Sequence, residues 1–256
     1  LEDAINENTS AIYLETPANP NLDIIDIKEI SKLKDEYDIK IIVDNTFATP
    51  YFQKPLNLGA DVVVHSATKY ISGHGDVVAG VAVADNQEYI HQLKFNYMAE
   101  YGGVLSPFNA WLLLRGLKTL GLRMRAHQEN ALKVAEFLNN HSEISRVYYP
   151  GLPQFSGYKT AQSQMSGFGS IISFELKGDI SRAEKFVDAL DMIKLAVSLG
   201  DAETLIEYPF AMTHRGYTEE ELKELGLNKK MIRLSVGLEG HQDIINDIDK
   251  ALNLEG

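Results

Sequence analysis

Four residues that could do chemistry together lie in the string IIVDNTFATPYFQKPLNLGADVVVHSATKYISGHGDVVAG: Asp44, Ser66, Thr68 and Lys69. A lysine amine can form a Schiff base with an aldehyde, and a carboxylate can pair with a protonated ring nitrogen. Two hydroxyls close to a glycine-rich turn can hold a phosphate group together with backbone N–H groups. The combination therefore indicates chemistry on a bound, phosphate-bearing aromatic aldehyde.

Two short apolar runs must position these side chains. The runs Ile41–Val43 and Val62–Val64 are rich in β-branched residues, and a polar residue follows each of them. This pattern predicts buried strands of a parallel sheet. Ligands of such sheets bind beyond the carboxyl ends of the strands, so we expect the four side chains to meet at one edge. An acid, two hydroxyls and a lysine at that edge fit pyridoxal phosphate.

Simpler interpretations of these residues stay open at this point. Lys69 could be a solvated surface lysine, and Asp44 could cap the next turn through Thr46. The tetrapeptide Ser66-Ala67-Thr68-Lys69 also matches the S-x-x-K motif of penicillin-binding enzymes, but S-D-N and K-T-G are absent from the chain. Neither G-x-x-x-x-G-K-[ST] nor G-x-G-x-x-G occurs, so nothing supports a nucleotide site.

Composition excludes several classes of protein. The 256 residues carry a formal net charge of −12, which argues against a nucleic-acid or anionic-membrane partner. There is no cysteine, so disulfides and cysteine-based metal sites are impossible. No apolar run approaches the ~18 residues of a membrane span, and we expect a reducing, cytoplasmic setting. His65, His74 and Asp76 match no metal-ligand spacing, and no metal is predicted.

The same stretch resembles the trans-sulfuration (Cys/Met metabolism) family of pyridoxal phosphate enzymes. That family includes cystathionine γ-synthase, cystathionine γ-lyase, O-acylhomoserine sulfhydrylase and methionine γ-lyase. The resemblance covers essentially the whole chain and is carried by SATKYISGHGDVVAG and by ETPANP (15–20), VLSP (104–107), YPGL (149–152), AVSLGDAETLIEYP (196–209), MTH (212–214) and IRLSVGLE (232–239).

The resemblance implies roles for further residues. It implies that Asn19 contacts the cofactor and the substrate carboxylate, although an ordinary Asx turn explains an isolated asparagine in this sequence. Arg233 lies in the apolar string MIRLSV, where a charge needs a partner. The resemblance implies that this partner is the substrate carboxylate, with Ser198 facing the same group, and a structural salt bridge is the alternative. His214 is expected near the site without a catalytic role.

The fold class implied by the resemblance is α/β, fold-type I (aspartate aminotransferase-like), with a large cofactor domain of mostly parallel sheet and a smaller C-terminal α/β domain. We expect the boundary near Leu120, giving residues 1–120 and 121–256, and a helical stretch from Phe108 to Asn139 that passes between the domains. Hydrophobic spacing further predicts helices at 26–37, 88–98, 181–190 and 242–252, and strands at 11–15, 77–84, 169–176, 194–197 and 231–236.

The segment AVSLGDAETLIEYPFAMTH is most similar to methionine γ-lyases, which implies α,γ-elimination of L-methionine to methanethiol, 2-oxobutanoate and ammonia. Cystathionine γ-lyase, a homocysteine or cysteine desulfhydrase, cystathionine γ-synthase and O-acylhomoserine sulfhydrylase are the alternatives within the family. Compared with the family, roughly the first third is absent, and it would supply groups to a site between subunits of a homotetramer, a dimer of dimers. A non-catalytic α/β binding subunit is the alternative from another class.

Overall fold

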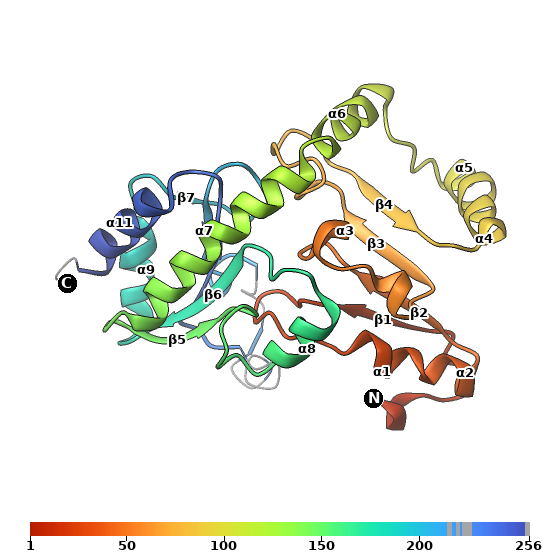
Figure 1. Ribbon diagram of the computed structural model, residues 1–256, viewed down its shortest axis with the longest axis horizontal. Helices are drawn as coiled ribbons and strands as arrows, with labels where there is room; N and C mark the ends of the chain where they lie inside the picture. The colour runs from red at the N-terminus through yellow and green to blue at the C-terminus, as the bar shows by residue number, and fades with distance from the viewer. Residues whose placement is uncertain (214–216, 219–220, 222–226, 254–256) are drawn as a thin grey trace.

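The structure is a computed structural model, which describes residues 1–213, 217–218, 221 and 227–253. Two sheets lie at opposite ends of the molecule (Figure 1). The long helix α7 (Leu120–Asn140) extends from the side of the first sheet along the second sheet. The strand order is β1-β2-β3-β4 in the first sheet and β5-β6-β9-β8-β7 in the second. Each sheet has its own buried hydrophobic cluster, because each must cover an apolar face.

The first sheet is mostly parallel, as predicted. The strand β1 pairs in parallel with β2, and β2 pairs in parallel with β3, while β4 is antiparallel to β3. The strand predicted over 77–84 is longer than the observed β4, because residues 77–79 are irregular and Ala79 is hydrogen-bonded to Thr68 and not to a neighbouring strand. The strands are β1 (Ala11–Glu15), β2 (Lys40–Asp44), β3 (Val62–Ser66) and β4 (Gly80–Val83).

Short helices connect these strands. Asp26 caps the first of them by accepting a hydrogen bond from the Glu29 N–H at 3.2 Å. The helix predicted over 26–37 is interrupted at Lys32. The helical elements of this part are η1 (Glu2–Ala4), α1 (Ile27–Ser31), α2 (Leu33–Tyr37), α3 (Thr49–Phe52), η2 (Pro55–Leu58), α4 (Gln87–Gln92), the π-helical η3 (Leu93–Tyr97) and α5 (Met98–Tyr101).

The predicted long helix is two helices, α6 (Pro107–Leu117) and α7. Ser106 caps α6 through its hydroxyl, which accepts a hydrogen bond from the Asn109 N–H at 3.1 Å. The break falls at residues 118–119 and not at the glycines of this stretch. The predicted domain boundary lies where α7 begins, and it stays a prediction.

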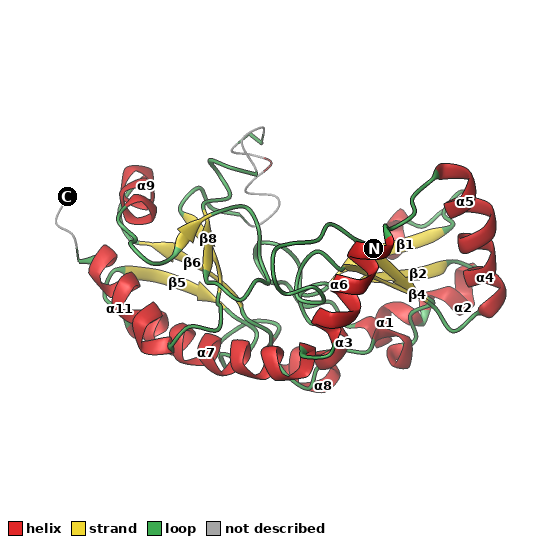
Figure 2. Cartoon of the chain, turned by 90° about the horizontal axis from the view of Figure 1, so that it is seen from above, coloured by secondary structure: helices red, strands yellow, loops and turns green. Residues whose placement is uncertain are grey.

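The second sheet is mostly antiparallel, with β7 and β8 as its one parallel pair in the described part of the chain. The helices α7 and α11 lie on the same side of this sheet (Figure 2). Two of its strands, β5 and β8, are not predicted from the sequence. The elements are β5 (Ile144–Tyr148), α8 (Tyr158–Gln164), β6 (Ile171–Leu176), α9 (Ile180–Asp188), β7 (Lys194–Leu195), β8 (Leu205–Glu207), β9 (Met231–Ser235) and α11 (His241–Leu252).

Among the described residues, no helix combines the length and the hydropathy that a membrane span requires.

Candidate active site

Polar groups gather at the carboxyl edge of the first sheet. Asp44 and Ser66 are the last residues of β2 and β3, and Lys69 lies in the turn that follows β3. That turn is closed by two backbone bonds, from the Lys69 N–H to the Ser66 carbonyl (3.1 Å) and from the Gly73 N–H to the Lys69 carbonyl (2.8 Å). The parallel register therefore brings these residues of distant sequence to one edge, as expected.

The Lys69 side chain is half-buried, and its amine has no hydrogen bond or ion pair among the residues that the structure describes. Burial lowers the pKa of Lys69, and the positive charge of Arg233 lowers it further, while the charges of Asp201 and Glu207 oppose the decrease. An amine with a lowered pKa is deprotonated more readily near neutral pH, which suits a nucleophile or a base.

The Asp44 carboxylate has one oxygen engaged locally. Oδ1 accepts hydrogen bonds from the Thr46 N–H (2.9 Å) and the Thr46 hydroxyl (2.6 Å). This is the turn cap that the sequence left open as an alternative. Oδ2 accepts a hydrogen bond from the hydroxyl of the exposed Tyr13 at 3.2 Å. Pairing with a ring nitrogen would therefore use Oδ2, and that role stays a prediction.

The two hydroxyls differ in their availability. The Ser66 hydroxyl has no hydrogen-bond partner within the described ranges, whereas the Thr68 hydroxyl is tied to the backbone of Ala79. It donates to the Ala79 carbonyl (3.2 Å) and accepts from the Ala79 N–H (2.9 Å). Ser66 can thus donate to a phosphate directly, but Thr68 would have to release the carbonyl first.

Arg233 forms a structural salt bridge, which the sequence left open as the alternative to substrate binding. Its Nη2 lies 2.5 Å from the Glu207 carboxylate, in register across β8 and β9, and both side chains are buried. Nη1 donates to the Asn19 side-chain oxygen at 3.1 Å, and Nη2 also donates to the carbonyls of Val197 (3.1 Å) and Ser198 (3.2 Å). The structure therefore brings Asn19, Ser198 and Arg233 together, and substrate binding by this group stays a prediction.

Sequence reasoning missed two acids beside this group. Glu207 lies in β8, a strand that was not predicted, and Glu15 ends β1. Burial raises the pKa of Glu15, and the nearby Asp44 charge adds to the increase. A charged residue inside the apolar string TLIEYP, matching the charge in MIRLSV, is the signal that could have revealed the Arg233–Glu207 pair.

A buried arginine fixes the Lys69 turn. The Arg123 guanidinium donates to the carbonyls of Tyr70 (2.7 Å) and Gly116 (3.0 Å). These hydrogen bonds connect α7 both to the Lys69 turn and to the C-terminal end of α6. Gly73 has a positive φ of 69°, and a Cβ built on it would lie 1.9 Å from Nη1 of Arg123. The glycine is therefore required both by the backbone conformation and by the close approach of the guanidinium.

Replacing Gly73 by alanine should lower the free energy of unfolding by about 2–4 kcal/mol, since the backbone is strained and the Arg123 hydrogen bonds are displaced. Gly102→Ala is the matched control, because Gly102 has a φ of 71° and no atom within 4 Å of a built Cβ. It should cost only about 1–2 kcal/mol. Urea denaturation measures both, and equal losses would contradict the role of Arg123.

The free groups at this edge fit pyridoxal phosphate in their chemistry. Among the described residues, the Lys69 amine and the Ser66 hydroxyl have no partner, and Asp44 Oδ2 lies beside the exposed Tyr13. These groups match an aldehyde, a phosphate and a pyridine nitrogen. Two buried polar atoms nearby, Arg233 Nε and Asp201 Oδ1, have no hydrogen-bond partner in the part of the chain that the structure describes. Within the described part of the chain no group of three metal-ligating side chains occurs, and His214 lies outside the described residues.

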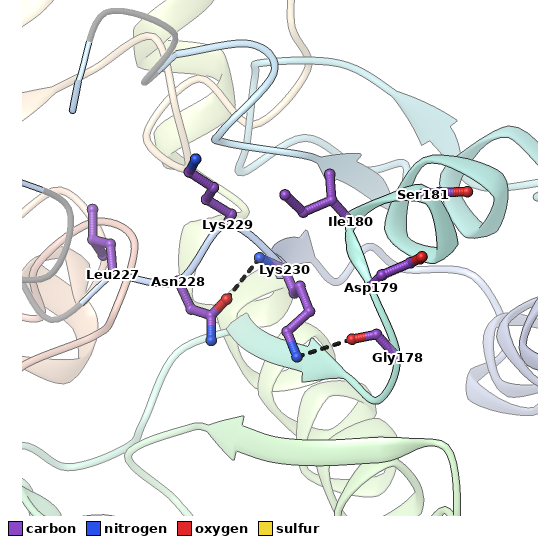
Figure 3. A pocket seen from close by; sticks show the side chains of 8 residues that line it. All are labelled: Gly178, Asp179, Ile180, Ser181, Leu227, Asn228, Lys229 and Lys230. Carbon is purple, nitrogen blue, oxygen red and sulfur yellow. Dashed lines mark hydrogen bonds between the residues drawn. The ribbon is translucent and has the colours of Figure 1, made fainter. Parts of the chain in front are cut away.

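A cavity of about 560 Å³ lies elsewhere, at the start of α9. Figure 3 shows Lys230 reaching across it, with its side-chain amine donating to the Gly178 carbonyl at 3.1 Å and its N–H donating to Asn228 at 2.9 Å. None of the predicted site residues lines this cavity. The space therefore does not mark the site at the edge of the first sheet.

Comparisons with known proteins identify a family and several similar chains. A family model described as "Cys/Met metabolism PLP-dependent enzyme" matches residues 1–253. An L-methionine gamma-lyase of Fusobacterium nucleatum subsp. polymorphum is 51% identical over 254 residues, which are 98% of this chain and 64% of the relative. A cystathionine beta-lyase of Lactococcus lactis subsp. cremoris (strain MG1363) is 50% identical over 252 residues, which are 98% of this chain and 66% of the relative.

Solved structures show the same fold. A cystathionine gamma-lyase from Lactobacillus plantarum, complexed with L-serine, matches with a TM-score of 0.94 and 44% identity over 98% of this chain and 65% of that chain. A cystathionine gamma synthase from Xanthomonas oryzae pv. oryzae, in complex with cystathionine, matches with a TM-score of 0.92 and 43% identity over 95% of this chain and 62% of that chain. The chain thus spans less than two thirds of the length of the first relatives.

Proposed function

Because the chain belongs to the Cys/Met metabolism PLP-dependent enzyme family, we propose that it is part of a carbon–sulfur lyase that eliminates methanethiol from L-methionine. The observation that carries the proposal is the half-buried amine of Lys69 at the carboxyl edge of the first sheet, which has no ion pair among the described residues and is close to the buried Arg233. The overall reaction consumes one water and gives methanethiol, 2-oxobutanoate and ammonia, which balances all atoms.

Each of the residues at the edge would bind one part of the cofactor. Lys69 would anchor it through Nζ, and Asp44 Oδ2 would pair with the ring nitrogen. The Ser66 hydroxyl, and Thr68 once it has released the Ala79 carbonyl, would hold the phosphate. Bound in this way, pyridoxal phosphate supplies an electron sink that makes the α-hydrogen of an amino acid acidic. The substrate carboxylate takes hydrogen bonds from the Arg233 guanidinium, supported by Asn19 and Ser198.

Proton transfer is assigned to one atom. Once the amine of the substrate has taken its place, Nζ of Lys69 accepts the α-proton and gives that proton up again before it takes a proton from Cβ. The sulfur on Cγ then leaves with its bonding electrons and takes up a proton, which gives methanethiol. Burial and the Arg233 charge, which lower the pKa of Lys69, favour the neutral amine that these steps require.

A second candidate is a lyase that acts on cystathionine, which is favoured by the 50% identity to a cystathionine beta-lyase. The two are distinguished by supplying methionine, cystathionine and homocysteine separately to the cofactor-loaded protein. We expect methanethiol and 2-oxobutanoate from methionine at the highest kcat/KM. Pyruvate and homocysteine from cystathionine, with little methanethiol from methionine, would reject the first choice. No product from any of the three would favour the non-catalytic binding subunit.

The assembly is proposed to be a homotetramer, a dimer of dimers, with each site between subunits, in a reducing cytoplasm. Support comes from the outer face of α6, which exposes four large hydrophobic side chains: Phe108 (66%), Trp111 (54%), Leu114 (63%) and Leu117 (46%). A patch of this kind marks an interaction surface. A monomeric mass by light scattering would contradict this assembly.

A further inference from the structure

The segment after β7 reaches from the second sheet to the Lys69 turn. A Cβ built on Gly200 would lie 2.8 Å from the Tyr70 nitrogen and 3.2 Å from the Lys69 carbonyl carbon. The Gly200 N–H donates to the Ser235 hydroxyl at 2.9 Å, which attaches the segment to β9. The next residue, Asp201, is therefore held beside the turn that carries Lys69.

The Asp201 side chain is buried, with 9% of its surface exposed. Its Oδ2 lies 3.5 Å from the Ser198 hydroxyl, and both carboxylate oxygens pack against Gly75, where a built Cβ would lie 3.1 and 3.2 Å from them. Oδ1 is buried and has no hydrogen-bond partner among the residues with a described position. A buried carboxylate that is this poorly satisfied is costly unless a positive charge lies nearby.

Among the described residues, Asp201 is the negatively charged neighbour of Lys69 that is not already part of an ion pair. Arg233, Asp201 and Glu207 are the charged groups that act on the lysine, and the first and last of these are joined in the ion pair at 2.5 Å. Asp201 forms no ion pair within the described ranges. The pair is nearly neutral as a unit, so Asp201 supplies the negative charge that offsets the Lys69 ammonium.

The pKa directions of the two groups agree with this arrangement. Burial raises the pKa of Asp201 and the neighbouring Glu203 adds to the increase, while Lys69, the Ser198 hydroxyl and the Gly75 N–H oppose it. In turn, the Asp201 charge opposes the lowering of the Lys69 pKa. Each group therefore stabilises the charged form of the other.

We propose that Asp201 is a positioning residue, whose carboxylate lies beside the Lys69 turn and acts on the ammonium of Lys69 as a counter-charge without a direct ion pair. The inference rests on the proposed role of Lys69 as the cofactor-anchoring amine. In this role Asp201, which lies in the segment after β7 of the second sheet, contributes a side chain to the site at the edge of the first sheet. If this carboxylate were removed, the Arg233–Glu207 pair would be the remaining charged neighbour of the half-buried lysine. The pKa of Lys69 would then be lower, so its amine would lose its proton at a lower pH.

The test is competitive labelling of the whole chain, free of cofactor, with trace acetic anhydride between about pH 6 and pH 11. Mass spectrometry of the Lys69 peptide gives the midpoint of its reactivity, with the exposed Lys177 as internal reference. Asp201→Asn should move the Lys69 midpoint down by about one pH unit. Asp201→Glu, which retains the charge, should restore most of this shift.

The matched control is Glu203→Gln, which removes one negative charge from an exposed residue of the same segment. It should leave the Lys69 midpoint within about 0.2 pH units of the wild type, because exposed charges are screened. If Asp201→Asn does not fold, Asp201→Ser makes the same charge change with a smaller side chain. An unchanged midpoint in a folded Asp201 variant would overturn the proposal.

Failure of this inference can be told from failure of the proposed function. An unshifted Lys69 midpoint, with cofactor still attached to Lys69 in the loaded wild type, would reject the role of Asp201 alone. A shifted midpoint without any cofactor attachment at Lys69 would reject the proposed function and leave the charge pairing intact. The labelling needs no catalysis, so the two outcomes are read independently.

Discussion

Lys69→Ala should lower kcat/KM for methanethiol release by about a thousandfold or more, the largest effect expected of any substitution in the chain. The variant loses the amine that anchors the cofactor and the base that accepts the α-proton, and no other described lysine lies at the carboxyl edge of the first sheet. Product release is measured under saturating pyridoxal phosphate, so that weaker cofactor binding is compensated by concentration.

Two control variants distinguish the loss of the reactive amine of Lys69 from the loss of a positive charge. Lys69→Arg keeps the positive charge but cannot serve as a base near neutral pH, and it should be as inactive as the alanine variant. Lys177→Ala removes an exposed lysine of the second sheet's periphery and should retain full activity. More than about a tenth of wild-type activity in either Lys69 variant would contradict the assignment of both roles to this amine.

Arg233→Ala should lower the free energy of unfolding by about 3–5 kcal/mol, because it leaves the Glu207 carboxylate buried without its cation. Arg233 is 3% exposed and Glu207 is 1% exposed. The double variant Arg233→Met with Glu207→Gln removes both charges and should recover much of this loss. If the single and double variants were equally unstable, the ion pair would not be the reason.

Because the alanine variant is destabilised, substrate binding is better tested with Arg233→Lys. This variant keeps a positive charge for Glu207 but loses the planar fork that holds a carboxylate with two bonds. The KM for the amino acid should rise by about tenfold or more, while cofactor attachment is retained. Loss of the cofactor from a folded Arg233→Lys would contradict the division between carboxylate clamp and cofactor anchor.

The strands of the first sheet could be predicted because each is a short apolar run that ends in a polar residue. Such runs are typical of strands in a parallel sheet, and β1 and the predicted cores of β2 and β3 are confirmed, with alternate residues of β1 and β2 buried. The solved relatives confirm the α/β, fold-type I class, and the family description confirms pyridoxal phosphate as the family's cofactor.

Much of the second sheet could not be predicted. The strand β8 has three residues, too few for any periodicity, and β5 alternates only weakly. The antiparallel order follows from long-range pairing that no local pattern encodes. The break between α6 and α7 likewise depends on Arg123, whose Nε donates to the Thr119 hydroxyl at 3.1 Å.

The gathering of Asp44, Ser66 and Lys69 was predictable, because parallel strands end at a common edge. The pairing of Arg233 with Glu207 was not, since it depends on the register of β8 against β9. The use of the Thr68 hydroxyl by Ala79 depends on how the chain folds back after the turn. Sequence reasoning thus finds groups at strand ends and misses those joined by tertiary register.

The central claim is a covalent bond between the cofactor and Nζ of Lys69. The most direct measurement is reduction of the pyridoxal phosphate-loaded protein with borohydride, followed by digestion and mass spectrometry of every lysine-containing peptide. The account predicts a phosphopyridoxyl group on the peptide that contains Lys69, in near-stoichiometric yield, with the other peptides unmodified. A Lys69 peptide of unmodified mass, or label spread over exposed lysines, would contradict it.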